Sequence, residues 1–377
     1  MTPEPEIRDA AKAPASPRLA SLDALRGADM LCILGLDAFF HALRALFPQS
    51  GAARFLAEQF SHKAWEGLAL YDLIFPLFVF VAGASMAFSL EKKRSRGESP
   101  ARIVAELFRR AALLALIGFA LQGGLSFAFA ETRFPSVLAL IGISGALGGT
   151  IAVLLRTPRR VLAATLALSA AFAALQLFGG DFTPENSLNA RLDRLLLPGK
   201  LHGGVFDPEG ILCVAGATVS VLFGFLAGTL LRAENLAPRR KILVLLAAGA
   251  ALLLAAWGAD ALGLPVVKKL WTQSFVFAAA GWSALLLALF HLLFDVLPGV
   301  PALRAVAYFF RVVGVNALAI YALQWVFDFF GLSRLLFGGV AGLCGGAGTL
   351  VLVAGAILLK WLLLRALERR KIFIKIG

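Results

Sequence analysis

Residues 68–90 read LALYDLIFPLFVFVAGASMAFSL, an apolar run in which Asp72 is the single charged side chain. At about 1.5 Å per residue, an α-helix of this length measures about 35 Å, which exceeds the ~30 Å hydrocarbon core of a bilayer. The basic stretch EKKRSR at 91–96 follows directly, and such clusters keep a helix end in the cytoplasm. The stretch therefore predicts a transmembrane helix whose C-terminal end is cytoplasmic.

Comparable apolar runs recur along the chain, whose 377 residues are 59% hydrophobic and only 16% charged. Soluble domains are nearer half apolar and a quarter charged, so this composition favours a membrane protein. We predict a single all-α integral membrane domain over residues 18–377, a polytopic bundle of about ten transmembrane helices, or eleven. A polar, Pro/Ala-rich tail at 1–17 is expected to be disordered and cytoplasmic. The predicted spans are 28–47, 68–90, 107–123, 135–155, 161–178, 210–231, 242–262, 271–294, 306–330 and 345–366.

Nineteen of the 36 lysines and arginines cluster in four separate segments, and all four segments fall on one face if the spans alternate. That face is then cytoplasmic and holds both termini. The net charge of +13 is explained by these segments, and no basic face of a soluble fold is left to bind nucleic acid. The residues are Lys92, Lys93, Arg94, Arg96, Arg102, Arg109, Arg110, Arg156, Arg159, Arg160, Arg232, Arg239, Arg240, Lys241, Arg365, Arg369, Arg370, Lys371 and Lys375.

Three loops, at about 48–67, 179–209 and 258–270, are then expected on the opposite, outer side. Two of them carry histidines, His62 and His202. The 179–209 loop is long and rich in Gly, Pro and charge, and loops of this length are usually functional. We therefore expect a polar substrate on the outer side of the membrane.

His62 precedes the 68–90 span at its outer end. Histidine side chains change charge near neutral pH, which suits them to accept a proton from an amine or a hydroxyl, although a headgroup-level hydrogen bond fits this position equally well. Trp65 is typical of the aromatic belt. Asp72 lies inside the span, where a carboxylate is costly and a functional role is the default hypothesis. On one continuous helix ten residues span ~15 Å, so we expect no direct bond between His62 and Asp72.

Asp37 and His41 are four residues apart in the first span, so they share a helix face and can pair. A structural ion pair fits them, and so does a role for Asp37 beside His62. At the cytoplasmic mouth of this span lies RLASLDALRG, residues 18–27, where arginines serve either as membrane anchors or as bidentate ligands of phosphate. The candidate donor-site residues are Arg18, Ser21, Asp23 and Arg26.

Other kinds of site lack a sequence signature. Cys32, Cys213 and Cys344 lie in apolar runs without paired spacing, which favours packing roles over disulfides. The four histidines are scattered and form no HExxH motif, so no metal site is expected. Glycine-rich phosphate-binding motifs and a serine nucleophile elbow are also absent from the sequence.

Residues 62–76, HKAWEGLALYDLIFP, match the pattern H-x-x-W-x-G-x-x-x-x-D-L-x-F-P. Further characteristic stretches follow in the same order along the chain. They are RLASLDALRG at 18–27, RLDRLLLPGK at 191–200, FDPEGIL at 206–212, KKLWTQSF at 268–275, GVNALAIY at 314–321 and KIFIKI at 371–376. Through these residues the chain resembles the heparan-α-glucosaminide N-acetyltransferase family, the lysosomal enzyme and its bacterial relatives, over nearly all of its length from residue 18.

The resemblance implies that His62 is the catalytic residue. Asp72 and Asp37 are the further candidate catalytic residues, taken from their positions in the spans, although the lysosomal branch has Asn at the position aligned with Asp37. The resemblance also implies cytosolic acetyl-CoA as the donor and the amine of glucosamine or a terminal glucosaminide on the far side as the acceptor. An acetylated His62 and a ternary complex with His62 as base both remain open. The residues implied for acceptor binding are Trp65, Asp193, Arg194, Asp207 and Glu209.

The sequence lacks the long N-terminal luminal extension of the lysosomal enzyme and so resembles the bacterial members. This implies a homodimer in the bacterial cytoplasmic (inner) membrane, with His62 facing the periplasm. Two other functions remain compatible with the residues. One is an amino-sugar transporter that uses Asp37 and Asp72 for proton coupling, and the other is a membrane O-acyltransferase of a periplasmic glycan.

Overall fold

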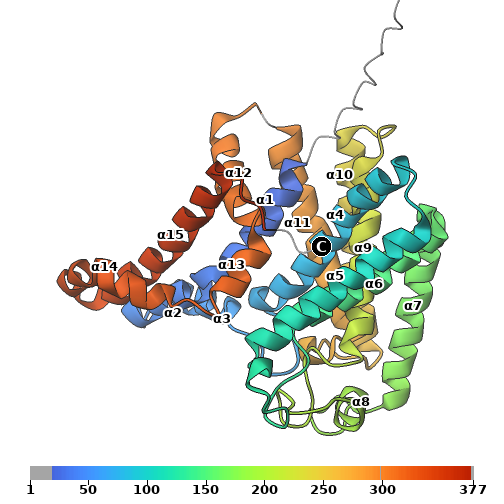
Figure 1. The fold of residues 1–377 in the computed structure, drawn as a ribbon, viewed down its shortest axis with the longest axis horizontal. Helices are drawn as coiled ribbons and strands as arrows, with labels where there is room; N and C mark the ends of the chain where they lie inside the picture. The colour runs from blue at the N-terminus through green and yellow to red at the C-terminus, as the bar shows by residue number, and fades with distance from the viewer. Residues whose placement is uncertain (1–18, 298, 375–377) are drawn as a thin grey trace, which may run out of the picture.

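The computed structural model describes residues 19–297 and 299–374, and these form α-helices joined by short connections (Figure 1). Within these ranges the β-structure is limited to two isolated antiparallel bridges, so the all-α prediction is confirmed. The predicted tail 1–17 and Arg18 lie outside the described residues. The helices are α1 (Ala20–Leu31), α2 (Asp37–Leu46), α3 (Gly51–Gln59), α4 (Leu70–Ser95), α5 (Pro100–Leu121), α6 (Val137–Leu155), α7 (Pro158–Gly179), α8 (Leu188–Leu196), α9 (Cys213–Arg232), α10 (Pro238–Ala261), α11 (Gln273–His291), α12 (Pro301–Gly314), α13 (Ala317–Leu323), α14 (Phe329–Leu343) and α15 (Gly348–Arg369), with single turns η1 (Cys32–Leu36), η2 (Gly124–Ser126), η3 (Lys268–Leu270), η4 (Leu292–Val296) and η5 (Gly345–Ala347).

Seven of these helical segments are long and apolar enough to cross a membrane. They are α4, α6, α7, α9, α10, α11 with η4, and α15 with η5. The pair α12 and α13 qualifies as an eighth span, bent by 54° at the break between the two helices. The described residues thus form a helical protein with seven or eight candidate membrane spans, where the sequence windows predicted ten.

The two remaining predicted spans, 28–47 and 107–123, fall on helices of a different kind. The first lies on α1, η1 and α2, where a π-helical turn interrupts the α-helix and Gly35 has a φ of +135°. The second lies in α5, whose first half is charged. Its apolar part, residues 111–121, measures about 16 Å, which is shorter than the bilayer core.

Close backbone contacts place α4 and α1 at the centre of the bundle. A Cβ atom at Gly224 of α9 would lie 1.9 Å from the carbonyl oxygen of Phe80, and one at Gly83 of α4 would lie 2.1 Å from that of Val221. A Cβ at Gly27 would lie 1.8 Å from the carbonyl oxygen of Phe310 in α12. Small residues are used in this way where membrane helices approach closely. The contacts fix α4 against α9 and α1 against α12.

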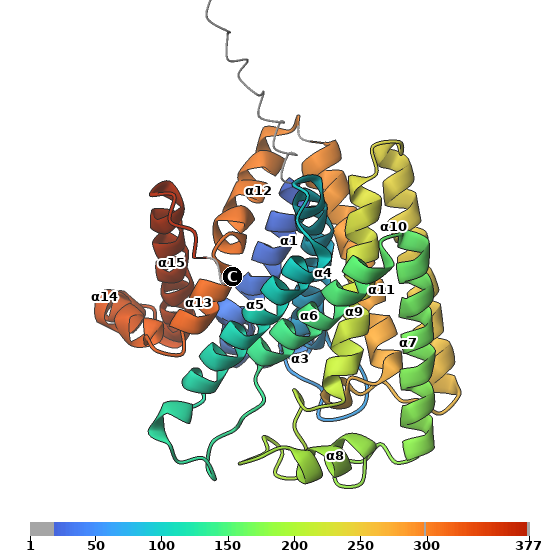
Figure 2. The same cartoon turned by 45° about the vertical axis from the view of Figure 1, so that its right-hand side comes forward.

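The connections between helices gather at two opposite ends of the bundle. Figure 2 shows the α4–α5, α6–α7 and α9–α10 connections toward the upper end, and α8 with the α10–α11 connection at the lower end. The upper connections carry the basic clusters of the sequence. The three predicted outer loops contain short helices of their own, namely α3, α8 and η3. One end of the bundle is therefore basic, and the other holds the loops that carry His62 and Lys268.

Candidate active site

The loop before α4 is held against the segment that precedes α11. Gly67 has a φ of +100°, which an L side chain rarely adopts, and its N–H donates to the carbonyl of Val266 (2.9 Å). This turn ends the extended loop and lets α4 begin at Leu70. The loop 62–69 consequently lies beside residues 265–268.

Asp72 joins this loop to the start of α4. Its carboxylate accepts the backbone N–H groups of Ala69 (3.0 Å) and Lys63 (3.3 Å), and thereby caps the helix N-terminus. His62 Nδ1 lies 2.8 Å from Asp72 Oδ1. The expectation that ~15 Å separates these two residues was wrong. It assumed one continuous helix, whereas α4 begins only at Leu70 and the loop folds back over its end.

Lys268 of η3 completes a cluster of three ionisable groups. Its Nζ lies 2.9 Å from His62 Nδ1, 3.5 Å from His62 Nε2 and 3.4 Å from Asp72 Oδ1. Burial lowers the pKa of Lys268, and the Asp72 carboxylate offsets part of that shift. Nδ1 cannot both donate to Asp72 and accept from Lys268. When the His62 Nδ1–H donates to Asp72, the Lys268 ammonium cannot donate to Nδ1. It then lies beside the imidazole and pairs with the Asp72 carboxylate.

Tyr71 and Asp37 extend the cluster toward α2. The His62 ring packs on the Tyr71 ring with centroids 4.7 Å apart, and the Tyr71 hydroxyl interacts with the Asp37 carboxylate. The expected pairing of Asp37 with His41 was wrong, since no hydrogen bond joins them in the described chain. His41 Nε2 instead lies 3.3 Å from Ser61 Oγ. Asp37 therefore reaches His62 only through Tyr71.

A cavity of about 210 Å³ opens in front of this cluster. Its polar wall consists of His62, Lys268, Glu209 and two tyrosines, and the opposite wall is apolar. The His62 side chain is 51% exposed, so solutes can reach the imidazole. The remaining lining residues are Met30, Ile33, Tyr71, Ile74, Phe75, Phe78, Val137, Leu138, Ile141, Leu318 and Tyr321.

A second cavity, of about 320 Å³, lies on the side of the basic end. Arg26 of α1 and Arg110 of α5 line it, and Arg26 donates to Ser85 Oγ (2.6 Å). Glycines and alanines of α6 and the α12–α13 break form much of its wall. Two guanidinium groups in one groove suit an anionic, phosphate-bearing ligand.

The two cavities share three wall residues, Phe78, Ile141 and Leu318. Along α4 the first begins at Tyr71 and the second ends at Ser89, eighteen residues or about 27 Å further on. This distance is close to the ~30 Å thickness of a hydrocarbon core. Together the cavities therefore extend along most of a span, and the shared residues Phe78, Ile141 and Leu318 lie where they meet.

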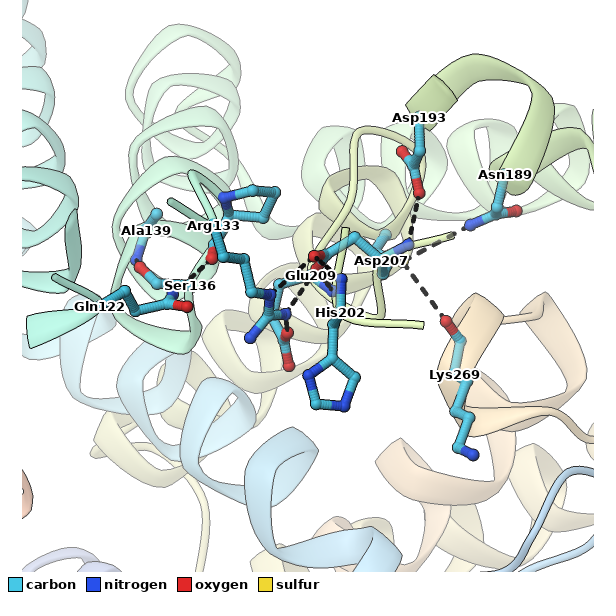
Figure 3. Close-up of polar contacts among 12 residues, drawn as sticks. Gln122, Arg133, Ser136, Ala139, Asn189, Asp193, His202, Asp207, Glu209 and Lys269 are labelled. Atoms are coloured by element: carbon cyan, nitrogen blue, oxygen red, sulfur yellow. Dashed lines mark hydrogen bonds and ion pairs between the residues drawn. The ribbon is translucent and has the colours of Figure 1, made fainter. Parts of the chain in front are cut away.

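Glu209 is positioned in the first cavity by Arg133 and Asp207. Arg133 donates to Asp207 from Nε (2.7 Å) and from a terminal nitrogen (2.5 Å), and it also pairs with Glu209 (Figure 3). Burial raises the pKa of Glu209, and the Arg133 charge opposes that shift. Burial also lowers the pKa of Arg133, but its two carboxylate partners outweigh this effect and raise the pKa overall. One guanidinium thus holds two buried carboxylates of the outer loop.

Asp193 supports this loop from behind. Its carboxylate accepts the backbone N–H of Asp207 (3.0 Å), as Figure 3 shows. It also accepts the backbone N–H of Ile211 (3.0 Å). Gly210 must be a glycine here, because a Cβ atom would lie 2.3 Å from an Asp193 oxygen. Asp193 and Asp207, expected in the acceptor pocket, therefore hold the backbone that carries Glu209, and Glu209 alone of the three lines the cavity.

Trp65 and Arg194 also contact loop backbone rather than the cavity. Trp65 Nε1 donates to the carbonyl of Phe182 (2.8 Å), and Arg194 donates to those of Glu185 (2.7 Å) and Val205 (3.2 Å). Neither side chain lines the first cavity in the described part of the chain. Both residues tie the outer loops together.

Of the four residues expected at the donor site, Arg26 alone is seen to line the second cavity. Asp23 accepts a hydrogen bond from Arg26 (3.3 Å), which orients the guanidinium. The backbone N–H of Ser21 donates to Asp295 (3.3 Å), and its hydroxyl is buried away from the cavity. Arg18 is outside the described residues.

Sequence reasoning missed four residues of these sites: Lys268, Tyr71, Arg110 and Arg133. Lys268 is the first residue of the stretch KKLWTQSF, and Tyr71 lies within HKAWEGLALYDLIFP. Both stretches had been recognised as characteristic, so these two residues could have been identified from them. Arg110 was grouped with the basic loop residues. Arg133 has no signal in the sequence, because its carboxylate partners are more than seventy residues away.

The chain is similar to curated relatives named heparan-α-glucosaminide N-acetyltransferase. The human protein is 31% identical over 134 residues, which is 34% of this chain and 18% of the human protein. The mouse protein is 34% identical over 91 residues, which is 22% of this chain and 14% of the mouse protein. The matched part thus spans less than a fifth of each relative. No family model matches the chain. The comparisons support a membrane N-acetyltransferase of this type at a distant and partial level.

Proposed function

We propose that this protein is a transmembrane N-acetyltransferase. It takes the acetyl group of acetyl-CoA from the basic, cytoplasmic end and transfers it to the amine of glucosamine or a terminal glucosaminide at the other end. One observation carries the proposal: a cavity with two arginines and a cavity with a His–Asp–Lys cluster meet at Phe78, Ile141 and Leu318. The named relatives supply the reaction class.

The donor binds in the second cavity. Arg26 and Arg110 pair with the phosphates of CoA, as guanidinium groups do with phosphate oxygens. The apolar wall formed by Phe78, Ile141 and Leu318 accepts the pantetheine arm and directs the thioester toward His62. Asp23 and Ser85 orient the Arg26 guanidinium through their hydrogen bonds with it.

His62, Asp72 and Lys268 carry the chemistry. Asp72 accepts a hydrogen bond from the His62 Nδ1–H and fixes this tautomer, so that Nε2 is free to take a proton from the attacking amine. The amine nitrogen forms a C–N bond to the acetyl carbon while the C–S bond breaks. The CoA sulfur takes the proton that His62 Nε2 accepted from the amine and leaves as the thiol. The Lys268 ammonium stabilises the negative charge that develops on the carbonyl oxygen.

The acceptor approaches from the loop end of the bundle. Glu209 faces the cavity and can accept hydrogen bonds from sugar hydroxyls or an ammonium group. Asp193, Arg194, Asp207 and Trp65 act by holding the loops around it, and Tyr71 links Asp37 to the His62 ring. In this proposal the protein is a homodimer in a bacterial inner membrane, with the acceptor on the periplasmic side.

Purified protein in liposomes, supplied with radiolabelled acetyl-CoA and glucosamine, tests the proposal. We expect N-acetylglucosamine to form, and His62→Ala to lower kcat about 10³-fold. His41→Ala is the matched control and should retain activity, because His41 hydrogen-bonds with Ser61 and does not line the cavity in the described structure. Two observations together would contradict the proposal: glucosamine accumulates in the liposomes when acetyl-CoA is absent, and no N-acetylglucosamine forms when acetyl-CoA is present.

A further inference from the structure

The segment after α15 returns to the donor cavity. Helix α15 ends at Arg369, and Lys371 has a φ of +56°, which reverses the chain direction. The N–H of Ile372 then donates to the carbonyl of Leu367 (2.9 Å). Two residues later, Ile374 lines the same cavity as Arg26. Residues Lys371–Ile374, which we name the return segment, therefore form part of the wall of that cavity.

One side chain, Asn316, holds the return segment in place. Its Nδ2 donates to the carbonyl of Ile372 (3.1 Å), and its Oδ1 accepts the N–H of Ile374 (2.9 Å). A neighbouring strand would bond the same two groups, because the C=O of one residue and the N–H two residues later point to the same side of extended backbone. Asn316 itself is 1% exposed, so the side-chain end of both bonds is shielded from water.

The position of Asn316 connects the return segment with the cavity wall. It lies at the break between α12 and α13, where the helices bend by 54°. Gly314, Val315, Ala317 and Leu318 on either side of it all line the donor cavity. The break between α12 and α13 therefore does two things: its flanking residues form part of the cavity wall, and its Asn316 side chain bonds to the return segment.

We propose that the return segment is part of the acetyl-CoA site and that Asn316 is the positioning residue that keeps it there. The inference rests on the proposed function and names a further set of donor contacts. Alternate backbone groups point to opposite sides, so the N–H and C=O of Phe373 face away from Asn316. They can pair with the two amide groups of the pantetheine arm, while Ile374 adds an apolar contact.

Cysteine labelling tests whether the donor contacts the return segment. In a background with Cys32, Cys213 and Cys344 replaced by serine, the variants Ile374→Cys, Ser89→Cys and Glu234→Cys are labelled with a maleimide, with and without saturating acetyl-CoA. Ser89 lines the donor cavity, and Glu234 is exposed at the same end of the bundle but does not line it. We expect acetyl-CoA to slow labelling at positions 374 and 89 by at least about fivefold, and not at 234.

The three positions separate the two proposals. Protection at 89 without protection at 374 would overturn the role of the return segment and leave the donor cavity intact. Protection at neither position would instead argue against the proposed function itself.

Kinetics of Asn316→Ala test the positioning role. Losing both hydrogen bonds to the return segment should raise KM for acetyl-CoA about tenfold while kcat stays within about twofold, and should speed labelling of Ile374→Cys. Ser333→Ala is the matched control, since it also removes a buried side-chain bond to a backbone carbonyl, that of Leu352, far from the cavity. An unchanged KM, or an equal rise in both variants, would overturn the role of Asn316.

Discussion

The cavity in front of His62 and the cavity beside Arg26 are built in different ways. The polar groups of the first come from loops and helix ends and are joined to one another by hydrogen bonds and ion pairs, as His62, Asp72 and Lys268 are. The two charged groups of the second, Arg26 and Arg110, project from within helices α1 and α5.

This difference fits two different tasks. Proton transfer and charge stabilisation need atoms held within a few tenths of an ångström, which a cross-linked loop cluster provides. Holding a long anionic ligand needs room and positive charge, which a groove between helices with small residues provides. Each of the following variants alters one cavity and leaves the other intact, and the variants are given from the largest expected effect to the smallest.

Asp72→Asn should have the largest effect. The amide loses the negative charge that fixes and stabilises the His62 imidazole, so we expect kcat to fall about 10³-fold with little change in KM for acetyl-CoA. The amide oxygen of asparagine can still accept the Ala69 N–H from the first turn of α4, so the helix should still form. Asp328→Asn is the control, because Asp328 caps α14 away from both cavities. Equal kcat values for the two variants would remove Asp72 from the mechanism.

Lys268→Met should lower kcat about 10²-fold, since it removes one charge next to the reacting carbonyl. Burial holds the pKa of Lys268 below its usual 10.5, so the ammonium is present at low pH and is lost as pH rises through that lowered pKa. Activity of the native protein should therefore decline at alkaline pH. In Lys268→Arg, whose guanidinium stays charged, the decline should move to higher pH. Identical pH profiles of kcat would contradict this role.

Arg26→Ala and Arg110→Ala should each raise KM for acetyl-CoA about 10- to 30-fold and leave kcat within about threefold, because each loses a charge-assisted contact with phosphate. Isothermal titration with CoA checks the same loss without turnover. Arg109→Ala is the control, as Arg109 neighbours Arg110 in sequence but does not line the cavity. A fall in kcat as large as that of Asp72→Asn would erase the division between the two regions.

Ser21→Ala should have the smallest effect. Among the described residues, the buried Ser21 hydroxyl has no hydrogen-bond partner, and the contact of Ser21 with Asp295 uses the backbone N–H, which alanine retains. We expect KM for acetyl-CoA to stay within twofold and stability to change by less than about 1 kcal/mol. A clear rise in KM would return Ser21 to the donor site that the sequence suggested for it.

The sequence by itself determined the class of fold and the motif that carries the site. The length and hydropathy of the apolar runs decide that helices cross a membrane, because in a bilayer every backbone group must be satisfied within its own helix. The pattern at 62–76 likewise identified His62 and Asp72 together. Those properties are local, so a linear reading finds them.

Only the tertiary structure decided how these residues meet. The bond between His62 and Asp72 depends on where α4 begins, and the place of Lys268 depends on the pairing of two loops about two hundred residues apart. Arg133 finds its carboxylates, and Asn316 the return segment, over similarly non-local contacts. Loop geometry and long-range partners are set by packing rather than by local propensity. The sequence therefore named His62 and Asp72, while the fold brought Lys268 to them and added the residues that hold the cluster.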